Sequence, residues 1–151
     1  MATSPKRPII VWIALAYIAI GLITNLLFLY TRAGQGQLFR PETSNIVFLI
    51  LNLVTIGLLI VTYDAVVRRK STGQRLAILS FSFVGIFGIY NTLVLFQSEV
   101  TFSNYPVITQ IIIFGRILLS FYLAFAFAVS ATIDRYFAEV DVEKPPPLTN
   151  Y

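Results

Sequence analysis

Four long runs of apolar residues alternate with short polar segments along this chain. An α-helix needs about 20 apolar residues to cross the hydrocarbon core of a bilayer, which is roughly 30 Å thick. Because lipid offers no hydrogen bonds, each run must satisfy its own backbone groups as a helix. The pattern predicts an all-α integral membrane protein, an antiparallel up-down-up-down bundle of four helices with short loops, spanning residues 9–30, 46–67, 76–97 and 107–133.

The first run is predicted to remain as a membrane span instead of being removed as a signal peptide. The apolar core of a signal peptide has about 7 to 15 residues and is followed by a small-residue cleavage site. Residues 9–30 carry no charge over a longer stretch, and the sequence Leu29-Tyr30-Thr31-Arg32 is not such a site. Trp12 and Tyr30 lie near the two ends of the run, as aromatic residues do at membrane interfaces.

The composition agrees with a lipid environment. Hydrophobic residues make up 57% of the chain and charged residues 12%, with a mean hydropathy of +0.80, whereas roughly a quarter of the residues of a soluble domain are charged. Cysteine and histidine are both absent, so the usual protein ligands of zinc, haem iron and iron–sulfur clusters are missing. We therefore expect no metal and no cofactor.

The net charge of +4 is distributed as in a membrane protein. Lys and Arg cluster at the ends of the apolar runs, where they orient the chain and meet anionic headgroups, so we expect no binding of nucleic acid. Eight of them fall on one side of the predicted topology and two on the other. The excess predicts that both termini and the middle loop are cytoplasmic. The larger group is Lys6, Arg7, Arg68, Arg69, Lys70, Arg75, Arg135 and Lys144, and the smaller is Arg32 and Arg40.

Two regions are expected along the chain, a four-span domain over residues 1–138 and a C-terminal tail over residues 139–151. The tail is acidic and contains Pro145-Pro146-Pro147. Consecutive prolines favour an extended polyproline II conformation. We therefore expect the tail to be flexible.

Two charges within the runs differ in how easily they can be neutralised. Asp64 stands four residues before Arg68, so a local ion pair at the membrane surface accounts for it. Arg116 lies nine residues into the fourth run, about 13 Å along a helix. An arginine at the centre of a span costs roughly 2.5 to 3.5 kcal/mol on insertion scales, so it implies a partner, a water-filled cavity or a side chain that extends to the interface.

Polar side chains from all four spans are expected at one level of the membrane, in its outer half. The asparagines at positions 25, 52 and 91 each lie roughly 8 to 9 Å below the outer boundary. One interpretation is that they form hydrogen bonds between helices, with Arg116 bonded to them or extended toward Glu99 and the headgroups. The other is an outward-facing pocket in which the arginine neutralises an anionic group. The candidate residues are Arg116, Asn25, Asn52, Asn91, Gln110, Tyr90 and Tyr122.

Small residues in the third and fourth spans predict close helix packing in the inner half of the bundle. The third span offers Ser82, Gly85 and Gly88, and the fourth offers the row Arg116, Ser120, Ala124, Ala128 and Thr132.

No catalytic motif is found, and the loops are too short to form a domain, so we expect no enzyme activity. The favoured hypothesis is an accessory or scaffold subunit that packs in a larger membrane assembly. The alternative is a module that binds or transports an anionic or lipid-like small molecule in a pocket around Arg116. We expect an integral protein of a bacterial inner (plasma) membrane, with the lipid bilayer as partner and with a membrane protein, a homo-oligomer or an anionic ligand as further candidates.

Overall fold

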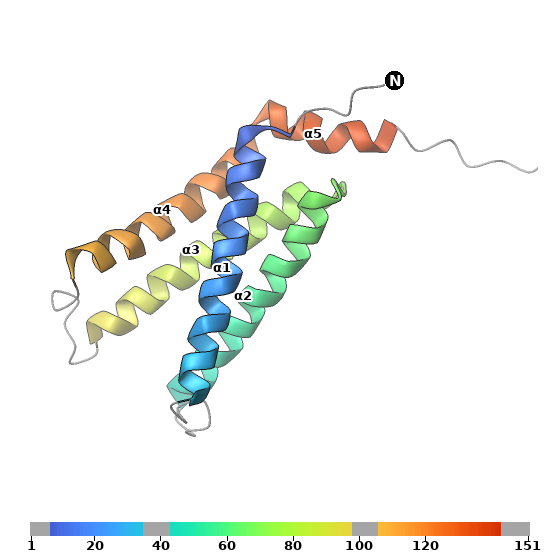
Figure 1. Cartoon of the computed structure of the whole chain (residues 1–151). Helices are drawn as coiled ribbons and strands as arrows, with labels where there is room; N and C mark the ends of the chain where they lie inside the picture. Colours follow the sequence, from blue (N-terminus) through green and yellow to red (C-terminus); the bar gives the residue numbers. More distant parts are fainter. Residues whose placement is uncertain (1–6, 35–42, 98–105, 143–151) are drawn as a thin grey trace, which may run out of the picture.

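The computed structural model describes residues 7–34, 43–97 and 106–142, and all the regular structure in these ranges is helical (Figure 1). Four helices, α1 to α4, are long and apolar enough to cross a membrane. The predicted all-α fold with four long apolar helices that pack against one another is therefore confirmed. The bounds are α1 Ile9–Gly34, α2 Thr43–Val67, α3 Gly73–Gln97, α4 Val107–Val129 and α5 Ala131–Val142.

Prolines begin two of these helices. The carbonyl oxygen of Pro8 accepts hydrogen bonds from the amides of Val11 and Trp12, and that of Pro106 accepts from Thr109 at 2.8 Å. Proline suits the start of a helix because its missing N–H would have no intrahelical partner there.

The connection between α2 and α3 is a tight turn. Asp64 bonds Arg68 at 2.5 Å and Lys70 at 2.6 Å, which confirms the expected local ion pair and adds a second cation to it. Arg69 has a φ of 51°, a left-handed conformation that lets the chain reverse. The amide of Gly73 then donates to the carbonyl of Lys70 at 2.7 Å, where α3 begins.

The fourth span ends earlier than the expected boundary at residue 133. Ser130 is extended, with φ −83° and ψ 110°, and the chain continues as α5 in a different direction (Figure 1). Hydropathy does not reveal this break because the residues around it are as compatible with an apolar helix as with a bend. Helix α5 also continues through Val142, past the expected start of the tail at residue 139. Residues 143–151 lie outside the described residues.

Gln74 of α3 stabilises the break between α4 and α5. Its Nε2 donates to the carbonyl of Phe127 at 2.8 Å and to Oδ1 of Asp134 at 2.6 Å. The bond to Phe127 matters because a helix that bends at Ser130 leaves the last carbonyls of α4 without their usual partners. Gln74 thus joins the first turn of α3 to both helices at the bend.

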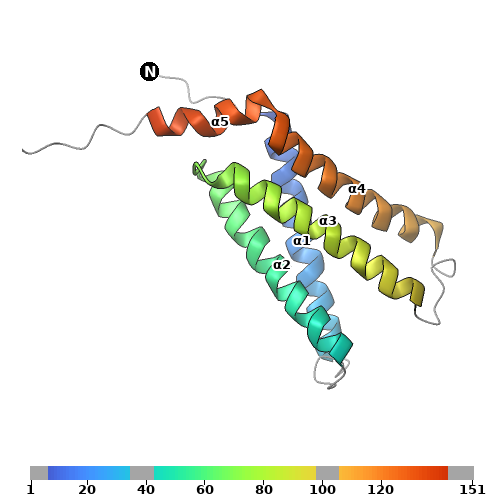
Figure 2. The same ribbon diagram turned by 180° about the vertical axis from the view of Figure 1, so that it is seen from behind.

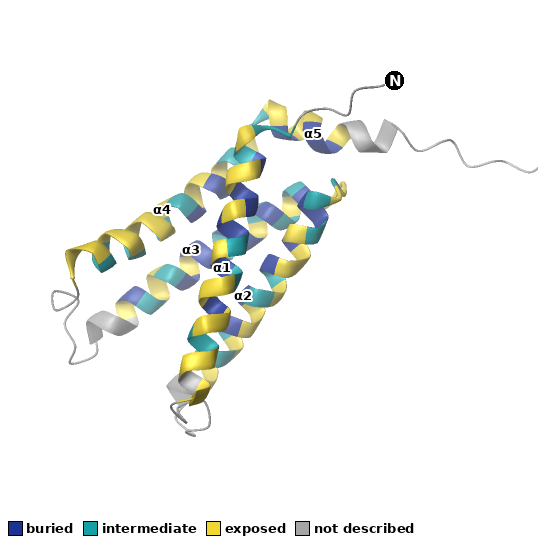
Figure 3. Ribbon diagram, viewed as in Figure 1, coloured by how far each residue is buried: buried dark blue, intermediate teal, exposed yellow. Residues whose placement is uncertain are grey.

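The buried core lies at one end of the molecule, which we call the packed end (Figure 3). It contains the N-terminal halves of α1 and α3, the C-terminal halves of α2 and α4, and the inner face of α5. Toward the opposite end, which we call the open end, the pair α1–α2 diverges from the pair α3–α4 (Figures 1 and 2). The core side chains are Val11, Ala14, Leu15, Tyr17, Ile18, Leu59, Val66, Ala77, Phe81, Val84, Leu123, Ala124, Phe127, Ile133, Tyr136 and Phe137.

Small residues allow α3 and α4 to approach closely. A Cβ atom added at Gly85 would lie 2.9 Å from the ring of Phe121, and one added at Gly88 would lie 2.8 Å from Cγ1 of Ile117. Neither position therefore has room for a larger residue.

The small-residue row expected on α4 is only partly at an interface. Ser120 and Ala124 are buried, whereas Ala128 and Thr132 are exposed. The row loses contact with the bundle because the break at Ser130 changes the direction of the chain, and Thr132 belongs to α5.

Candidate functional site

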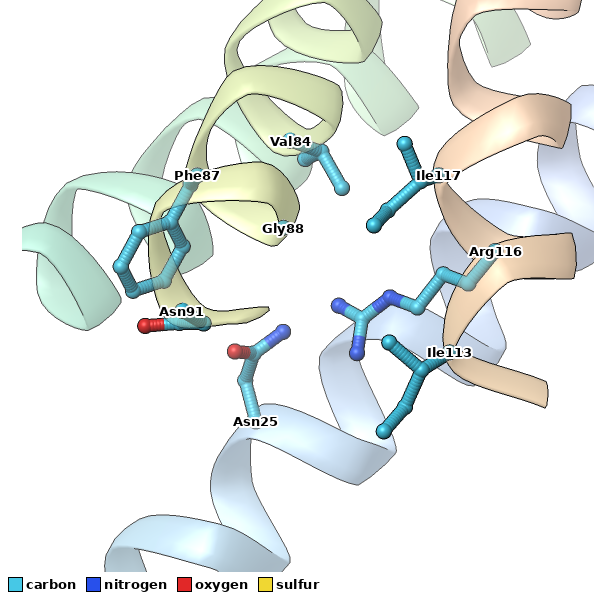
Figure 4. Close-up of a pocket in the computed structure, with 8 residues that line it drawn as sticks. All are labelled: Asn25, Val84, Phe87, Gly88, Asn91, Ile113, Arg116 and Ile117. Atoms are coloured by element: carbon cyan, nitrogen blue, oxygen red, sulfur yellow. The ribbon is translucent and has the colours of Figure 1, made fainter. Parts of the chain in front are cut away.

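Three of the candidate polar residues come together between α1, α3 and α4 (Figure 4). The Arg116 side chain extends from α4 toward Asn25 of α1 and Asn91 of α3. These residues lie next to a cavity of about 150 Å³. The rest of its lining is apolar and consists of Val84, Phe87 and Gly88 from α3 with Ile113 and Ile117 from α4.

The backbone at Arg116 is fixed by a contact from α1. The Ser120 hydroxyl donates to the carbonyl of Arg116 at 2.8 Å and accepts from the Tyr17 hydroxyl, whose oxygen lies 3.3 Å from the same carbonyl. These bonds hold α4 against α1 one turn below the arginine. The side chain of Arg116 is not part of them and remains directed into the cavity.

Asn25 is held by its own helix. Its Nδ2 donates to the carbonyl of Gly21 at 2.7 Å, and the residue is 7% exposed. Gly21 itself lies close to Leu59 of α2, because a Cβ atom added there would be 3.2 Å from Cδ1 of that leucine. The packing of α1 on α2 therefore sets the position from which Asn25 faces the cavity.

Asn91 carries an unsatisfied polar atom. Its Oδ1 is buried and has no hydrogen-bond partner among the described residues. A buried acceptor without a donor costs about 1 to 3 kcal/mol. Figure 4 shows this oxygen on the side of Asn91 that is turned away from Arg116.

The charge of Arg116 is likewise uncompensated within residues 7–34, 43–97 and 106–142. The ion pairs found there involve Asp64 at the packed end, and no hydrogen bond from the Arg116 guanidinium is found in the same ranges. Glu99, the carboxylate considered from the sequence, lies outside the described residues. A guanidinium offers five N–H donors in a planar fork that matches a carboxylate or phosphate group.

Arg116 is an exposed residue, whereas the buried polar residues Thr55, Thr62 and Ser80 are all paired. Thr62 and Ser80 bond each other at 2.6 Å across α2 and α3, and Thr55 donates to the carbonyl of Leu51 at 2.7 Å. An interhelical bond of the kind expected for the asparagines is thus found at Thr62 and Ser80, whereas Asn25 and Asn52 each donate to a carbonyl of their own helix. The polar groups at the cavity differ from them because Arg116 and Asn91 Oδ1 have unused capacity.

Four of the seven candidate residues do not line the cavity. Asn52 is buried on α2, where its Nδ2 donates to the carbonyl of Phe48 at 2.9 Å. Gln110 is half-buried on α4, and Tyr90 and Tyr122 are exposed. The asparagine of α2 is excluded because α2 packs against α1 and α3, whereas the cavity lies between α1, α3 and α4.

The apolar part of the lining was not predicted. Val84 and Gly88 lie on the face of α3 that carries Asn91, and Ile113 and Ile117 lie one turn or less from Arg116. The helical spacing of 3 and 4 residues around each polar residue would have indicated these positions.

No family model matches the chain, and neither a curated protein nor a solved structure matches it. The inferences about function therefore depend on the residues of the cavity and on the arrangement of the helices around it.

Proposed function

We propose that this chain is a non-catalytic integral membrane protein that binds an anionic group at Arg116. In the proposed topology the helices run up-down-up-down, both termini are in the cytoplasm of a bacterial cell, and the cavity lies in the outer half of the inner membrane. The main support is the Arg116 guanidinium, which is directed into the cavity and has no partner in the described part of the chain.

The energetic argument concerns the cost of this cation. Helix α4 places the Cα atom of Arg116 about 13 Å from its first residue, which is deep in a hydrocarbon layer of roughly 30 Å. A charge at that depth is unfavourable unless it is paired or hydrated. A carboxylate or phosphate group would accept two parallel hydrogen bonds from the guanidinium, and Asn25 would contribute to its orientation.

Substitution of Arg116 by glutamine tests this proposal. The wild-type protein, purified in a mild detergent, is expected to retain an anionic molecule that native mass spectrometry detects. Arg116→Gln removes the charge-assisted hydrogen bonds, worth about 1.5 to 3 kcal/mol, so occupancy should fall by roughly ten-fold or more. Arg116→Lys keeps the positive charge but lacks the parallel N–H donors of the guanidinium. We expect its occupancy to lie between those of the wild type and Arg116→Gln.

Arg135→Gln is the matched control, because Arg135 is an exposed arginine of α5 that does not line the cavity. It should leave occupancy unchanged. Equal occupancy in the wild type and in Arg116→Gln would contradict the proposal, as would a wild-type protein that carries no anion and binds none when palmitate, acetate or phosphate is added.

A second candidate function is the accessory or scaffold subunit. It is favoured by the divergence of the two helix pairs at the open end (Figures 1 and 2), where large apolar side chains such as Leu26 and Ile112 are exposed at 54% and 63%. A partner helix could cover these faces. If Arg116→Gln fails to assemble into its native complex in membranes, with bound anion unchanged, the scaffold function is supported instead of the binding function.

A further inference from the structure

We infer that the bound molecule is an anionic amphiphile, a single acyl chain with a carboxylate or phosphate head, whose head occupies the cavity and whose chain stays in the bilayer. This inference rests on the proposed function and specifies its ligand. It follows from the volume of the cavity, the chemistry of its walls and the way in which α1 and α4 meet.

The volume indicates that only part of a ligand is enclosed. Sites that enclose a drug-sized molecule have volumes of about 300 to 1,000 Å³, whereas this cavity has about 150 Å³. A carboxylate or phosphate head with its first methylene groups is small enough for such a space. The remainder of the molecule must then lie outside the cavity, against the surfaces of the neighbouring helices.

Those surfaces are apolar. Ile113 and Ile117 form the wall of the cavity beside Arg116, and Ile112, one helical turn before Arg116, is 63% exposed. A free inorganic anion would exchange its hydration for one guanidinium, two amides and five apolar residues. An amphiphile makes the same polar contacts, and its acyl chain is kept out of water by the membrane and by these helix faces. Each methylene group that is removed from water contributes about 0.8 kcal/mol.

The arrangement of α1 and α4 provides a path from the bilayer. A side-chain hydrogen bond between Tyr17 and Ser120 joins these helices on the packed-end side of Arg116. Beyond it, toward the open end, the helices diverge (Figures 1 and 2). Arg116 is itself an exposed residue, so the head can reach it between α1 and α4 while its chain remains among lipids.

The test compares long-chain and short-chain anions on the purified full-length protein in mild detergent. Palmitate and lysophosphatidate are the amphiphilic probes, acetate and inorganic phosphate are the soluble probes, and monopalmitoylglycerol is the uncharged amphiphile. Native mass spectrometry measures the fraction of protein that carries one adduct. Comparing palmitate with lysophosphatidate establishes which of the two heads binds more tightly.

We expect a single adduct with palmitate or lysophosphatidate that a hundred-fold excess of acetate or phosphate does not displace. The adduct should fall at least ten-fold in Arg116→Gln and remain in Arg135→Gln. Ile113→Trp, which fills the cavity and leaves Arg116 in place, should reduce it to a similar extent. Monopalmitoylglycerol should bind at least ten-fold less than either charged probe.

Different results overturn different statements. If acetate or phosphate displaces the long-chain adduct at equal concentration, the amphiphile is excluded and the anion site at Arg116 is retained. If the uncharged amphiphile binds as well as palmitate, or if the adduct survives Arg116→Gln, both the amphiphile inference and the proposed function are contradicted.

Discussion

At the residue scale, Gly73 has the least free space of the glycines in the described part of the chain. A Cβ atom added there would lie 2.6 Å from Cε1 of Phe137 and 2.9 Å from the carbonyl oxygen of Ala65. The backbone oxygen of α2 cannot move without disturbing the turn that connects α2 to α3. The absence of a side chain at Gly73 is therefore what allows α2, α3 and α5 to meet at the packed end.

Gly73→Ala is expected to destabilise the protein by about 1 to 3 kcal/mol, the usual cost of overpacking. Thermal unfolding in detergent micelles, followed by circular dichroism, measures the effect as a lower midpoint temperature. Gly57→Ala is the matched control, because nothing lies within 4 Å of a Cβ atom added at Gly57, and alanine is the better helix former. Equal midpoints for the two variants would contradict the packing described here.

The polar residues of the candidate site could be predicted from the sequence, but their partners could not. Asn25, Asn91 and Arg116 stand out because each interrupts an apolar run, and the 1.5 Å rise per residue of a helix gives their common depth. Asn52 has the same signature and lies elsewhere. Whether an asparagine faces the cavity depends on which helices are neighbours and how each is rotated, and an apolar run with a weak polar face does not determine that rotation.

At the scale of secondary-structure elements, the break between α4 and α5 depends on a side chain from a third helix. Gln74 bonds both Phe127 and Asp134, on the two sides of Ser130. Apart from the end of α4, the start and the end of each long helix followed from the apolar pattern, within a few residues. The break did not, because its cause is more than 50 positions away along the chain and no local pattern contains it.

Gln74→Leu should loosen α5 while leaving the long helices intact. The carbonyl of Phe127 and the Asp134 carboxylate would lose a donor, and the loss of one such partner costs about 1 to 3 kcal/mol. Hydrogen–deuterium exchange of the amides of residues 131–138 should be roughly ten-fold faster than in the wild type, with exchange in α1 unchanged. Arg75→Leu, at the exposed neighbouring position, is the control; a Gln74→Leu protein with wild-type exchange in α5 would rule out the stabilising role.

At the scale of the whole molecule, the four spans were predictable and the divergence of the helix pairs was not. Length and hydropathy determine that a segment crosses the bilayer, whereas the angle between helix pairs depends on where large and small side chains meet. Gly85 and Gly88 bring α3 close to α4, while the core side chains draw both pairs together at the packed end alone. Such an arrangement depends on contacts between residues far apart in the sequence.

The proposed topology is testable because the chain contains no cysteine. Ser71→Cys places a single thiol on the exposed turn between α2 and α3, and Gln37→Cys places one in the sequence between α1 and α2. A membrane-impermeant maleimide added to intact cells should label Gln37→Cys and not Ser71→Cys, because the excess of Lys and Arg keeps the middle loop in the cytoplasm. Both should react after permeabilisation. The reverse labelling pattern would show that the orientation is inverted.

The divergence of the two helix pairs makes the molecule a wedge, and in the proposed topology its wider end lies in the outer leaflet. We expect lateral pressure from the surrounding acyl chains to act on that wider half and to push α1 and α4 toward each other. Lipids that raise the lateral pressure in that leaflet should therefore reduce the space beside Arg116 and weaken the binding of a molecule there.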